Sequence, residues 1–464
     1  MPASSRVARA AGSCVAGVVL LVALLPAVAA RAADPVAMVV DLVTRDDAEF
    51  RAIGLERVRI GVKGEAATRA IAALLEKLPA ARQTELVRAL ADRGDPAALP
   101  AFVALLDRAE EPAARAAAIA AVGMLGSAEA VPVLLKSLAA GGPEQAAARR
   151  ALTAIRGDAA VGQIVAAAKS GDPKLRPVLI DVITDRRVRS ALPDLAALAT
   201  DGDAAVRQAA LKALGGMGGA AQVPAMIAGL LAATPGGERQ AAERAVVAVC
   251  TRNPGHEEAA KAFLDAFKAA TEADQESLLP ALGAIGGGGA LAIIDGMVAD
   301  AEAGRRQFGL KALARWPDAT VAPRLIDLVG KARDQAERDL VLGALIRIAP
   351  LPDNKLDDAK KLDLVKRTME LCATDAERAR LLERAGAIRT FETFQFVAPF
   401  LDQPALAAPA CKSVVELAHH QNLRDAHKSE FLAALDKVIA TTQDSELVER
   451  ATRYKEGKTW ERKR

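Results

Sequence analysis

The stretch "AVGMLGSAEAVP" at residues 121–132 returns twice further along the chain, as "ALGGMGGAAQVP" at residues 213–224 and as "ALGAIGGGGALA" at residues 281–292. Each copy begins with an apolar run and carries glycine at its third and sixth positions. Recurrence of one pattern along a chain indicates a repeat architecture, in which one supersecondary unit is stacked many times.

The last residue of each copy provides a register mark that recurs along the chain at intervals of roughly 30 to 36 residues. Apolar residues recur ten and thirteen positions before the mark, and positions three apart lie on one face of a helix. Each unit therefore predicts a first helix, a turn that contains glycine, and a second helix. The marks are Pro100, Pro132, Gly162, Pro193, Pro224, Ala260, Ala292 and Pro323.

Two recurrent residue types predict how each helix pair begins and ends. We expect the glycine six residues before the mark to form a left-handed cap on the first helix. We expect the proline at the mark to lie near the start of the second helix, where a missing N–H costs least. The glycines are Gly126, Gly218 and Gly286, and the prolines are Pro100, Pro132, Pro193, Pro224 and Pro323.

Helix pairs with a period of about 31 residues, and with second helices such as "AVPVLLKSL" at residues 130–138, resemble the HEAT repeat family in its short bacterial form, related to phycobilin lyase repeats. The resemblance implies an all-α, armadillo-like α-solenoid of stacked antiparallel helix pairs that wind into a right-handed superhelix. It covers residues 47–330, and weaker segments such as "LDDAKKLDLVKRTMELC" at residues 356–372 extend it. Such solenoids serve mostly as binding scaffolds and only sometimes as enzymes.

Residues 1–32 resemble a cleavable secretory signal peptide. Arg6 and Arg9 precede an apolar run of about 11 residues, "VAGVVLLVALL" at residues 15–25, and small residues follow it. The run is shorter than the roughly 20 residues that a spanning helix needs. We expect cleavage after Ala32, with cleavage after Ala29 as the alternative, and hence a periplasmic or secreted protein without a transmembrane span.

Loss of residues 1–32 removes three arginines and no acid, which brings the formal net charge from +3 to zero. A neutral chain has no general attraction for nucleic acid, so we expect none as a partner. The mature chain keeps three cysteines, an odd number that implies no disulfide framework. We expect Cys250 to be a small buried hydrophobe, while a bridge between Cys372 and Cys411 is an alternative.

A cation recurs seventeen residues before the mark, at Arg115, Arg176, Arg207 and Arg306, with glutamine at Gln83, Gln145 and Gln275. One interpretation is a ladder of cations for an acidic ligand. We favour a structural role, in which each side chain reaches an acid or a carbonyl of the adjoining repeat, as similar arginines do in HEAT proteins.

The second helices are expected to form the concave face, where a protein partner would bind. The positions one and four after the mark have no recurrent aromatic, no basic stripe and no row of Trp and Asn. They are Ala101 and Ala104, Val133 and Lys136, Asp194 and Ala197, Ala225 and Ala228, and Arg324 and Asp327. The face suits a folded partner recognised by shape.

The sequence indicates no catalytic, cofactor or metal site. Four glycines at residues 286–289 resemble a phosphate-binding loop, but they lack both a preceding strand and a following Lys and Ser/Thr. The four His-Glu pairs of the related deoxyhypusine hydroxylase reduce here to His256 and Glu257. His419, His420 and His427 could hold zinc, although a polar loop is the interpretation that we favour, because adjacent histidines point to different sides of a helix.

We therefore expect an exported, non-catalytic scaffold for protein–protein interaction in the periplasm or cell envelope. The alternatives are a lyase-like or cofactor-handling HEAT protein and a helper subunit of an envelope enzyme. The expected divisions are a signal peptide at 1–32, the repeat solenoid at 33–350, a degenerate helical continuation at 351–454 and a basic tail at 455–464. This tail, which contains Trp460 and ends in Arg462, Lys463 and Arg464, is either solvated or makes a weak contact with an acidic envelope surface.

Overall fold

The computed structural model describes residues 34–352 and 355–460, and within these ranges every regular element is helical. The predicted all-α fold is therefore confirmed for this part of the chain. The predicted signal peptide and the last three basic residues of the tail lie outside the described residues. None of the described helices is both long and apolar enough to cross a bilayer.

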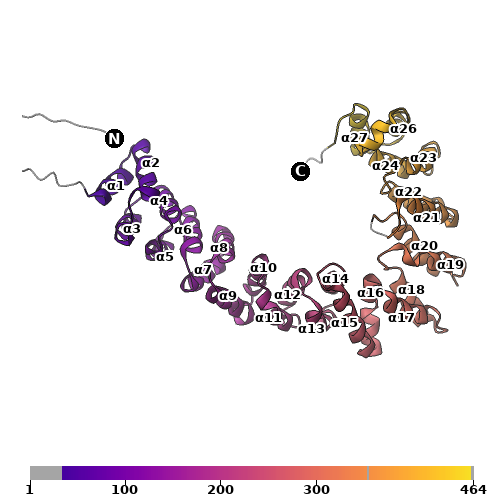
Figure 1. Cartoon of the computed structure of the whole chain (residues 1–464), viewed down its shortest axis with the longest axis horizontal. Helices are drawn as coiled ribbons and strands as arrows, with labels where there is room; N and C mark the ends of the chain where they lie inside the picture. Colours follow the sequence, from indigo (N-terminus) through magenta and orange to yellow (C-terminus); the bar gives the residue numbers. More distant parts are fainter. Residues whose placement is uncertain (1–33, 353–354, 461–464) are drawn as a thin grey trace, which may run out of the picture. The chain divides into compact units, whose positions relative to one another are not determined.

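The chain divides into two compact units, one up to Ala118 and the other from Ile119, so that the division falls within α6 (Pro112–Leu125). Figure 1 labels the helices in chain order. In the first unit, first helices alternate with second helices. They are α1 (Pro35–Thr44), α2 (Ala48–Glu56) with its π-helical extension η1 (Arg57–Gly61), α3 (Glu65–Ala72), η2 (Ala73–Glu76), α4 (Ala80–Arg93), η3 (Pro96–Ala98) and α5 (Leu99–Arg108).

In the second unit, the first helices pack side by side in one row, each against the next. This row is α8 (Gly142–Ala154), α10 (Arg176–Asp185), α12 (Ala204–Met217), α14 (Gly237–Thr251), α16 (Glu272–Ile285), α18 (Ala303–Leu313), α20 (Gln335–Ile348), α22 (Asp375–Ala385), α24 (Ala407–Ala418) and α27 (Ser445–Lys455).

The second helices alternate with them along the chain. They are α7 (Val131–Ala139), α9 (Asp158–Ser170), α11 (Leu192–Leu198), α13 (Val223–Ala232), α15 (His256–Ala269), α17 (Gly288–Val298), α19 (Ala322–Gly330), α21 (Asp358–Leu371), α23 (Phe391–Val397) and α26 (Lys428–Thr441). Short connecting elements are η4 (Ala128–Ala130), η5 (Arg189–Ala191), η6 (Ala220–Gln222), η7 (Ala319–Val321), η8 (Ala398–Asp402) and α25 (Gln421–Ala426).

Proline marks the start of a second helix wherever it was predicted to do so. Each of the five prolines is the second residue of its helix, in α5, α7, α11, α13 and α19. A 3₁₀ turn of three residues precedes each of these helices. Since the first turn of a helix has no intrahelical use for its N–H groups, proline fixes the start without losing a hydrogen bond.

The three register marks without proline keep the same register. Gly162, Ala260 and Ala292 each lie at the fifth residue of a second helix, and each proline mark is likewise the fifth residue counted from the start of the 3₁₀ turn before its helix. In α9, α15 and α17 the α-helix begins where the other units have a 3₁₀ turn. Gly286 and Gly287 form the turn between α16 and α17, with φ of 73° and 94°, which confirms the glycine run as an inter-helix turn.

Left-handed caps were predicted at three glycines. Gly286 has the positive φ of such a cap but not its ψ, and the prediction is wrong at Gly126 and Gly218. Gly218 has φ −71° and ψ 168°, which is extended backbone, and Gly126 also lacks a positive φ. Glycine is required there by crowding instead. A Cβ on Gly218 would lie 2.7 Å from the carbonyl oxygen of Leu214, and a Cβ on Gly126 would meet that of Val122.

Neighbouring first helices approach closely because small residues lie where they cross. A Cβ on Gly215 of α12 would lie 3.0 Å from Cα of Ala245 in α14, and a Cβ on Gly283 of α16 would lie 3.0 Å from Cα of Ala312 in α18. Larger apolar side chains, such as Leu214, fill the space beneath the crossing and are buried. The thin layers between helices therefore need alanine and glycine, which explains the low aromatic content.

We predict that Gly283→Ala lowers the free energy of unfolding by about 1–3 kcal/mol, because the added methyl group overpacks the contact with the backbone of Ala312. Gly296→Ala is the matched control, since a Cβ at this position in α17 meets no atom within 4 Å. Alanine is favoured over glycine in a helix by about 1 kcal/mol, so the control should be neutral or stabilising. Urea denaturation followed by circular dichroism measures both; equal midpoints for the two variants would contradict the packing argument.

Candidate interaction surface

The recurrent arginines lie near the start of first helices and bind the end of the preceding helix. Arg207 donates from Nη1 to the carbonyls of Asp201 at 2.7 Å and Gly202 at 3.1 Å. Its Nε and Nη2 donate to Oε1 of Glu238 in α14 at 3.0 and 2.7 Å. One guanidinium thus joins the carbonyls before α12 to the first turn of α14.

Arg306 repeats this arrangement. Its Nη1 donates to the carbonyl of Val298 at 2.6 Å, and its Nε and Nη2 bind the two carboxylate oxygens of Glu337 at 2.9 and 3.1 Å. The side chains of Arg306 and Glu337 are only 9% and 14% exposed. The hydrogen bond from Arg306 holds the pKa of Glu337 below its ordinary value of 4.5.

The two other arginines of the column make the same kind of contact. Arg176 binds the carbonyl of Ala168 at 3.0 Å and the carboxylate of Asp201, whose pKa it lowers. Arg115 donates to the carbonyls of Ala109 and Glu110. Carbonyls at a helix end carry partial negative charge, so a cation there is favourable. These contacts match the structural interpretation of the column rather than an acidic ligand.

A second set of polar residues was missed by the sequence analysis, although Arg93, Arg186 and Asn253 share one register, seven residues before the mark. Each lies at the end of a first helix and binds the carbonyls at the end of the preceding first helix. Arg186 Nη1 donates to the carbonyls of Leu152 at 3.0 Å and Ile155 at 2.6 Å. The equivalent contacts are Arg93 with Val58 and Val62, Asn253 with Gly215 and Gly218, and Arg347 with Ala314 and Trp316.

Of the three histidines near the C-terminus, His419 and His420 have adjacent rings with centroids 5.6 Å apart, whereas His427 packs on another aromatic ring. His419 Nδ1 lies 2.9 Å from the hydroxyl of Tyr454, and the ring of His427 stacks on Phe391 with centroids 3.5 Å apart. Burial lowers the pKa of His420. Within residues 34–352 and 355–460, no three His, Cys, Asp or Glu side chains gather as metal ligands would.

The three cysteines in the described part of the chain are free and buried. The alternative of a bridge between Cys372 and Cys411 is therefore wrong, because each thiol is enclosed in its own part of the core. Burial raises the pKa of Cys250 to about 12, so this residue is a small hydrophobe as predicted. A thiol with a raised pKa is a poor nucleophile at neutral pH.

The described part of the basic tail folds back on α27. The guanidinium of Arg450 lies 5.1 Å from the ring centroid of Trp460, and Arg453 Nε donates to the carbonyl of Thr459 at 3.0 Å. Lys458 pairs with Glu456 at 2.7 Å. Trp460 is thus partly covered by its own chain.

On the second helices, the residues one position after the proline marks are half-buried, except the exposed Arg324, and those four positions after the marks are exposed. The latter are Ala104, Lys136, Ala197, Ala228 and Asp327. Charges on these helices pair with one another: Lys169 of α9 with Asp194 of α11 at 2.6 Å, and Asp295 of α17 with Arg324 of α19 at 2.8 Å. The first of these pairs lies at a hollow of about 390 Å³ between α9 and α11, which Gly162, Ala166 and Ser190 also line.

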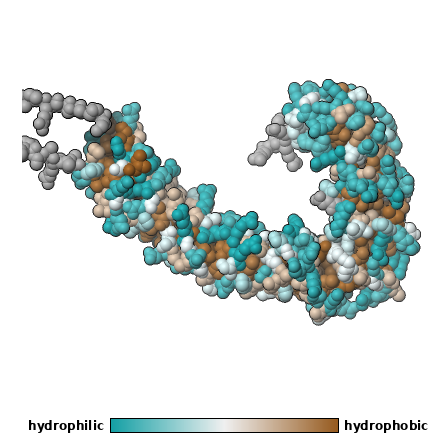
Figure 2. Space-filling view, viewed as in Figure 1, coloured by the Kyte–Doolittle hydropathy of each residue, from teal (hydrophilic) through white to brown (hydrophobic). Residues whose placement is uncertain are grey.

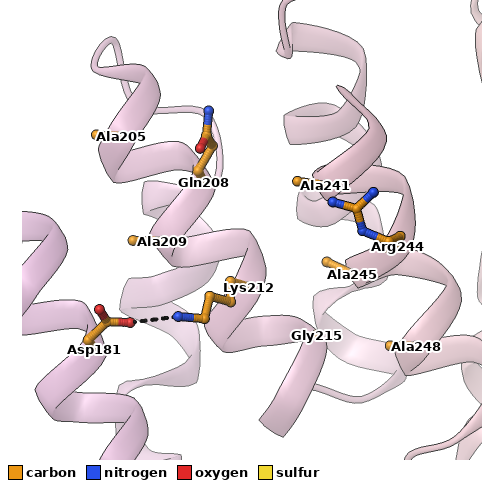
Figure 3. Close-up of a pocket in the computed structure, with 10 residues that line it drawn as sticks. All are labelled: Asp181, Ala205, Gln208, Ala209, Lys212, Gly215, Ala241, Arg244, Ala245 and Ala248. Atoms are coloured by element: carbon orange, nitrogen blue, oxygen red, sulfur yellow. Dashed lines mark hydrogen bonds and ion pairs between the residues drawn. The ribbon is translucent and has the colours of Figure 1, made fainter. Parts of the chain in front are cut away.

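A groove of about 490 Å³ opens on the first helices, between α12 and α14, and it reaches α10 (Figure 3). Its base consists of small residues, and its rim of longer polar ones. The lining residues are Asp181, Ala205, Gln208, Ala209, Lys212, Gly215, Ala241, Arg244, Ala245 and Ala248. We call this surface the α12–α14 groove. Alanine and glycine keep it open because they let α12 and α14 pack closely while projecting little above the backbone.

The rim of the α12–α14 groove offers unused hydrogen-bond donors. Lys212 is engaged, since its Nζ lies 3.2 Å from Oδ1 of Asp181. Gln208 on α12 and Arg244 on α14 lie on opposite sides of the groove, are exposed, and make no side-chain hydrogen bond or ion pair with the described residues (Figure 3). A guanidinium and an amide together suit a carboxylate or backbone carbonyls of a bound chain.

We predict that Arg306→Ala lowers the free energy of unfolding by about 3 kcal/mol, because it strands the buried carboxylate of Glu337. Glu337 has a lowered pKa in the folded state, so its contribution is present above pH 4.5 and is lost as the pH falls through the folded-state pKa. The variant should therefore lose less stability than the wild type between pH 5 and pH 3. Arg367→Ala, which removes an exposed pair with Asp363, is the control and should change stability by less than about 0.5 kcal/mol. Denaturation across this pH range measures all three proteins; parallel pH profiles for wild type and Arg306→Ala would contradict the prediction.

Comparison with known proteins supports the repeat architecture. The HEAT repeat model matches residues 67–153 and 162–247. No curated protein matches the chain. Among solved structures, the chain is similar to the karyopherin Kap121p bound to the extreme C-terminus of the protein phosphatase Cdc14p, with 10% identity, 90% of this chain and 53% of that chain covered, and a TM-score of 0.47. The chain thus spans about half the length of this karyopherin.

Two smaller proteins are also similar. Human deoxyhypusine hydroxylase in complex with glycerol has 21% identity, with 61% of this chain and 95% of that chain covered and a TM-score of 0.23. The complex of CpcE and CpcF of phycocyanin lyase from Nostoc sp. PCC7120 has 17% identity, with 70% and 97% covered and a TM-score of 0.22. The repeat match identifies HEAT repeats at residues 67–153 and 162–247, and the described residues as a whole form an all-helical α-solenoid of stacked helix pairs.

Proposed function

We propose that this chain is a non-catalytic HEAT-repeat scaffold that binds a protein partner. The observation that carries the proposal is the α12–α14 groove, in which Arg244 and Gln208 are unpaired beside small side chains. Most charged side chains near the helix starts already hold neighbouring repeats together, as Arg207 does with Glu238. Free donors beside an open groove therefore mark a surface available to another molecule.

The partner that fits this groove is a polypeptide segment with acidic side chains. The small base accepts a helix or an extended segment at close range, because alanine and glycine allow backbone-to-backbone approach. Arg244 then pairs with a carboxylate, and Gln208 hydrogen-bonds to the backbone or to a second polar group. Summed contacts of this kind give specificity without chemistry on the bound segment.

We further propose that the chain acts in the periplasm or the cell envelope. The support is the sequence of residues 1–32, with its basic start, its apolar run "VAGVVLLVALL" and the small residues before Ala33. In that location the basic tail makes a weak additional contact with an acidic envelope surface.

Reversal of one charge tests the groove. We predict that Arg244→Glu reduces retention of the partner at least about tenfold, because the new carboxylate repels an acidic segment. The full chain is used as bait in an envelope extract, and the retained proteins are quantified by mass spectrometry. Arg150→Glu is the matched control, since Arg150 is also exposed and unpaired but lies on α8 outside the groove. Equal retention by wild type and both variants would refute the groove as the binding site.

Export is tested separately by cell fractionation and N-terminal sequencing of the purified protein. We predict a mature chain that begins at Ala33, or at Ala30 if the alternative site is used, and that appears in the periplasmic or secreted fraction. Replacement of Leu20, Leu21 and Leu24 by arginine should trap the precursor inside the cell, since it abolishes the apolar run. A chain that keeps Met1 and stays in the cytoplasm would show that the export proposal is wrong.

A further inference from the structure

Exposed apolar surface is concentrated at one end of the first unit. Among the described residues, five large apolar side chains are highly exposed, and four of them lie between residues 38 and 60. They are Met38 on α1 (51% exposed), Phe50 and Ile53 on α2 (44% and 50%) and Ile60 on η1 (71%). Figure 2 shows hydrophobic surface over α1 and α2. Clustered exposed apolar residues mark interaction sites.

Phe50 and Ile53 share one face of α2, about 60° apart at 100° per residue. Ile60 follows on the π-helical η1, whose residues turn by less than 100° each. The opposite face of the same helix is buried, as Gly54 and Val58 show. We call this exposed stripe the α2 face. It is contacted by Arg45, whose guanidinium lies 5.0 Å from the ring centroid of Phe50, and its large apolar side chains are otherwise exposed.

Comparison with another first helix indicates that such a face is normally covered. In α12, which packs between α10 and α14, the third residue, Val206, is fully buried and the tenth, Ala213, is 1% exposed. The third residue of α2 is Phe50, and the tenth residue counted from its start is Arg57, which is exposed. The α2 face is therefore chemically a helix-packing surface that the described part of the chain leaves open.

We propose that the α2 face binds a second copy of this chain, with the two α2 helices antiparallel about a two-fold axis through Ile53. In this arrangement each residue faces the one equally far on the other side of Ile53 in the second copy. Ile53 then meets its own counterpart, and Glu49 faces Arg57. An isologous contact of this kind closes on itself and yields a dimer.

The charges on the α2 face support this occupant over an unrelated protein. Glu49 and Arg57 lie four residues before and four residues after Ile53, each about 40° from it around the helix. Both are exposed, and neither side chain makes an ion pair or hydrogen bond with the described residues. In this pairing Ile53 meets its own counterpart and the unpaired charges of Glu49 and Arg57 meet at matched distances, while Phe50 comes opposite Glu56 and Ile60 opposite Asp46. The flanking charges are already used, Glu56 by Arg59 at 3.3 Å and Arg45 by Asp41 at 2.7 Å.

Charge reversal at the two symmetric positions tests this arrangement. The full chain is purified as the cell produces it, and sedimentation equilibrium gives the dimer dissociation constant. We expect a dimer, a dissociation constant raised at least about tenfold in Glu49→Arg and in Arg57→Glu, and recovery to within about threefold of wild type when both changes are combined. Recovery is expected only if these two residues face each other across the interface.

The same measurement on further proteins supplies the control and the outcomes that would contradict the proposal. Arg88→Glu, on an exposed and unpaired arginine of α4 away from the α2 face, should dimerise like wild type. Circular dichroism should show unchanged folding in all variants, since the altered side chains have no partner within the described residues. A monomeric wild type at tens of micromolar would overturn the proposal, and so would a double variant as weak as either single one.

Discussion

Close approach between neighbouring first helices is the constraint on which the rest of the structure depends. Gly215 against Ala245, and Gly283 against Ala312, leave no room for a side chain at the crossing. At this distance the carbonyls at one helix end come within reach of a cation on the next repeat. The guanidinium contacts of Arg186 and Arg306 are thus a consequence of tight packing and also stabilise it, since they satisfy groups that water would otherwise have to reach.

This use of charge also determines what is left for binding. A repeat protein with many charged residues could present a ladder of cations, but here the guanidiniums of the recurrent column point into the joints between repeats. Arg176 and Arg207 illustrate this, with side chains 12% and 11% exposed. The groove proposed for binding therefore relies on positions outside the recurrent arginine column. Arg244 and Gln208 are such positions, since neither side chain makes a hydrogen bond or ion pair with the described residues.

The same distinction explains how much could be predicted from the sequence. Helix pairs, proline starts and the arginine column recur, so alignment of the chain with itself finds them. Gly218 was given a left-handed cap, although crowding by the carbonyl oxygen of Leu214 is what requires glycine. The α12–α14 groove could not be predicted, because it depends on which side chains stay unpaired after packing, and that is a property of neighbours far apart in sequence.

The faces of α27 and α2, near the two ends of the described residues, are covered differently. At α27, Tyr454 is 1% exposed, and the guanidinium of Arg424 lies 5.4 Å from its ring centroid. The guanidinium of Arg450 lies 5.1 Å from the ring centroid of Trp460. Aromatic rings under cations make that face compatible with water. At α2, by contrast, Phe50 and Ile53 are exposed, and the guanidinium of Arg45 lies 5.0 Å from the ring centroid of Phe50. An exposed apolar face with unpaired charges of both signs favours association over solvation.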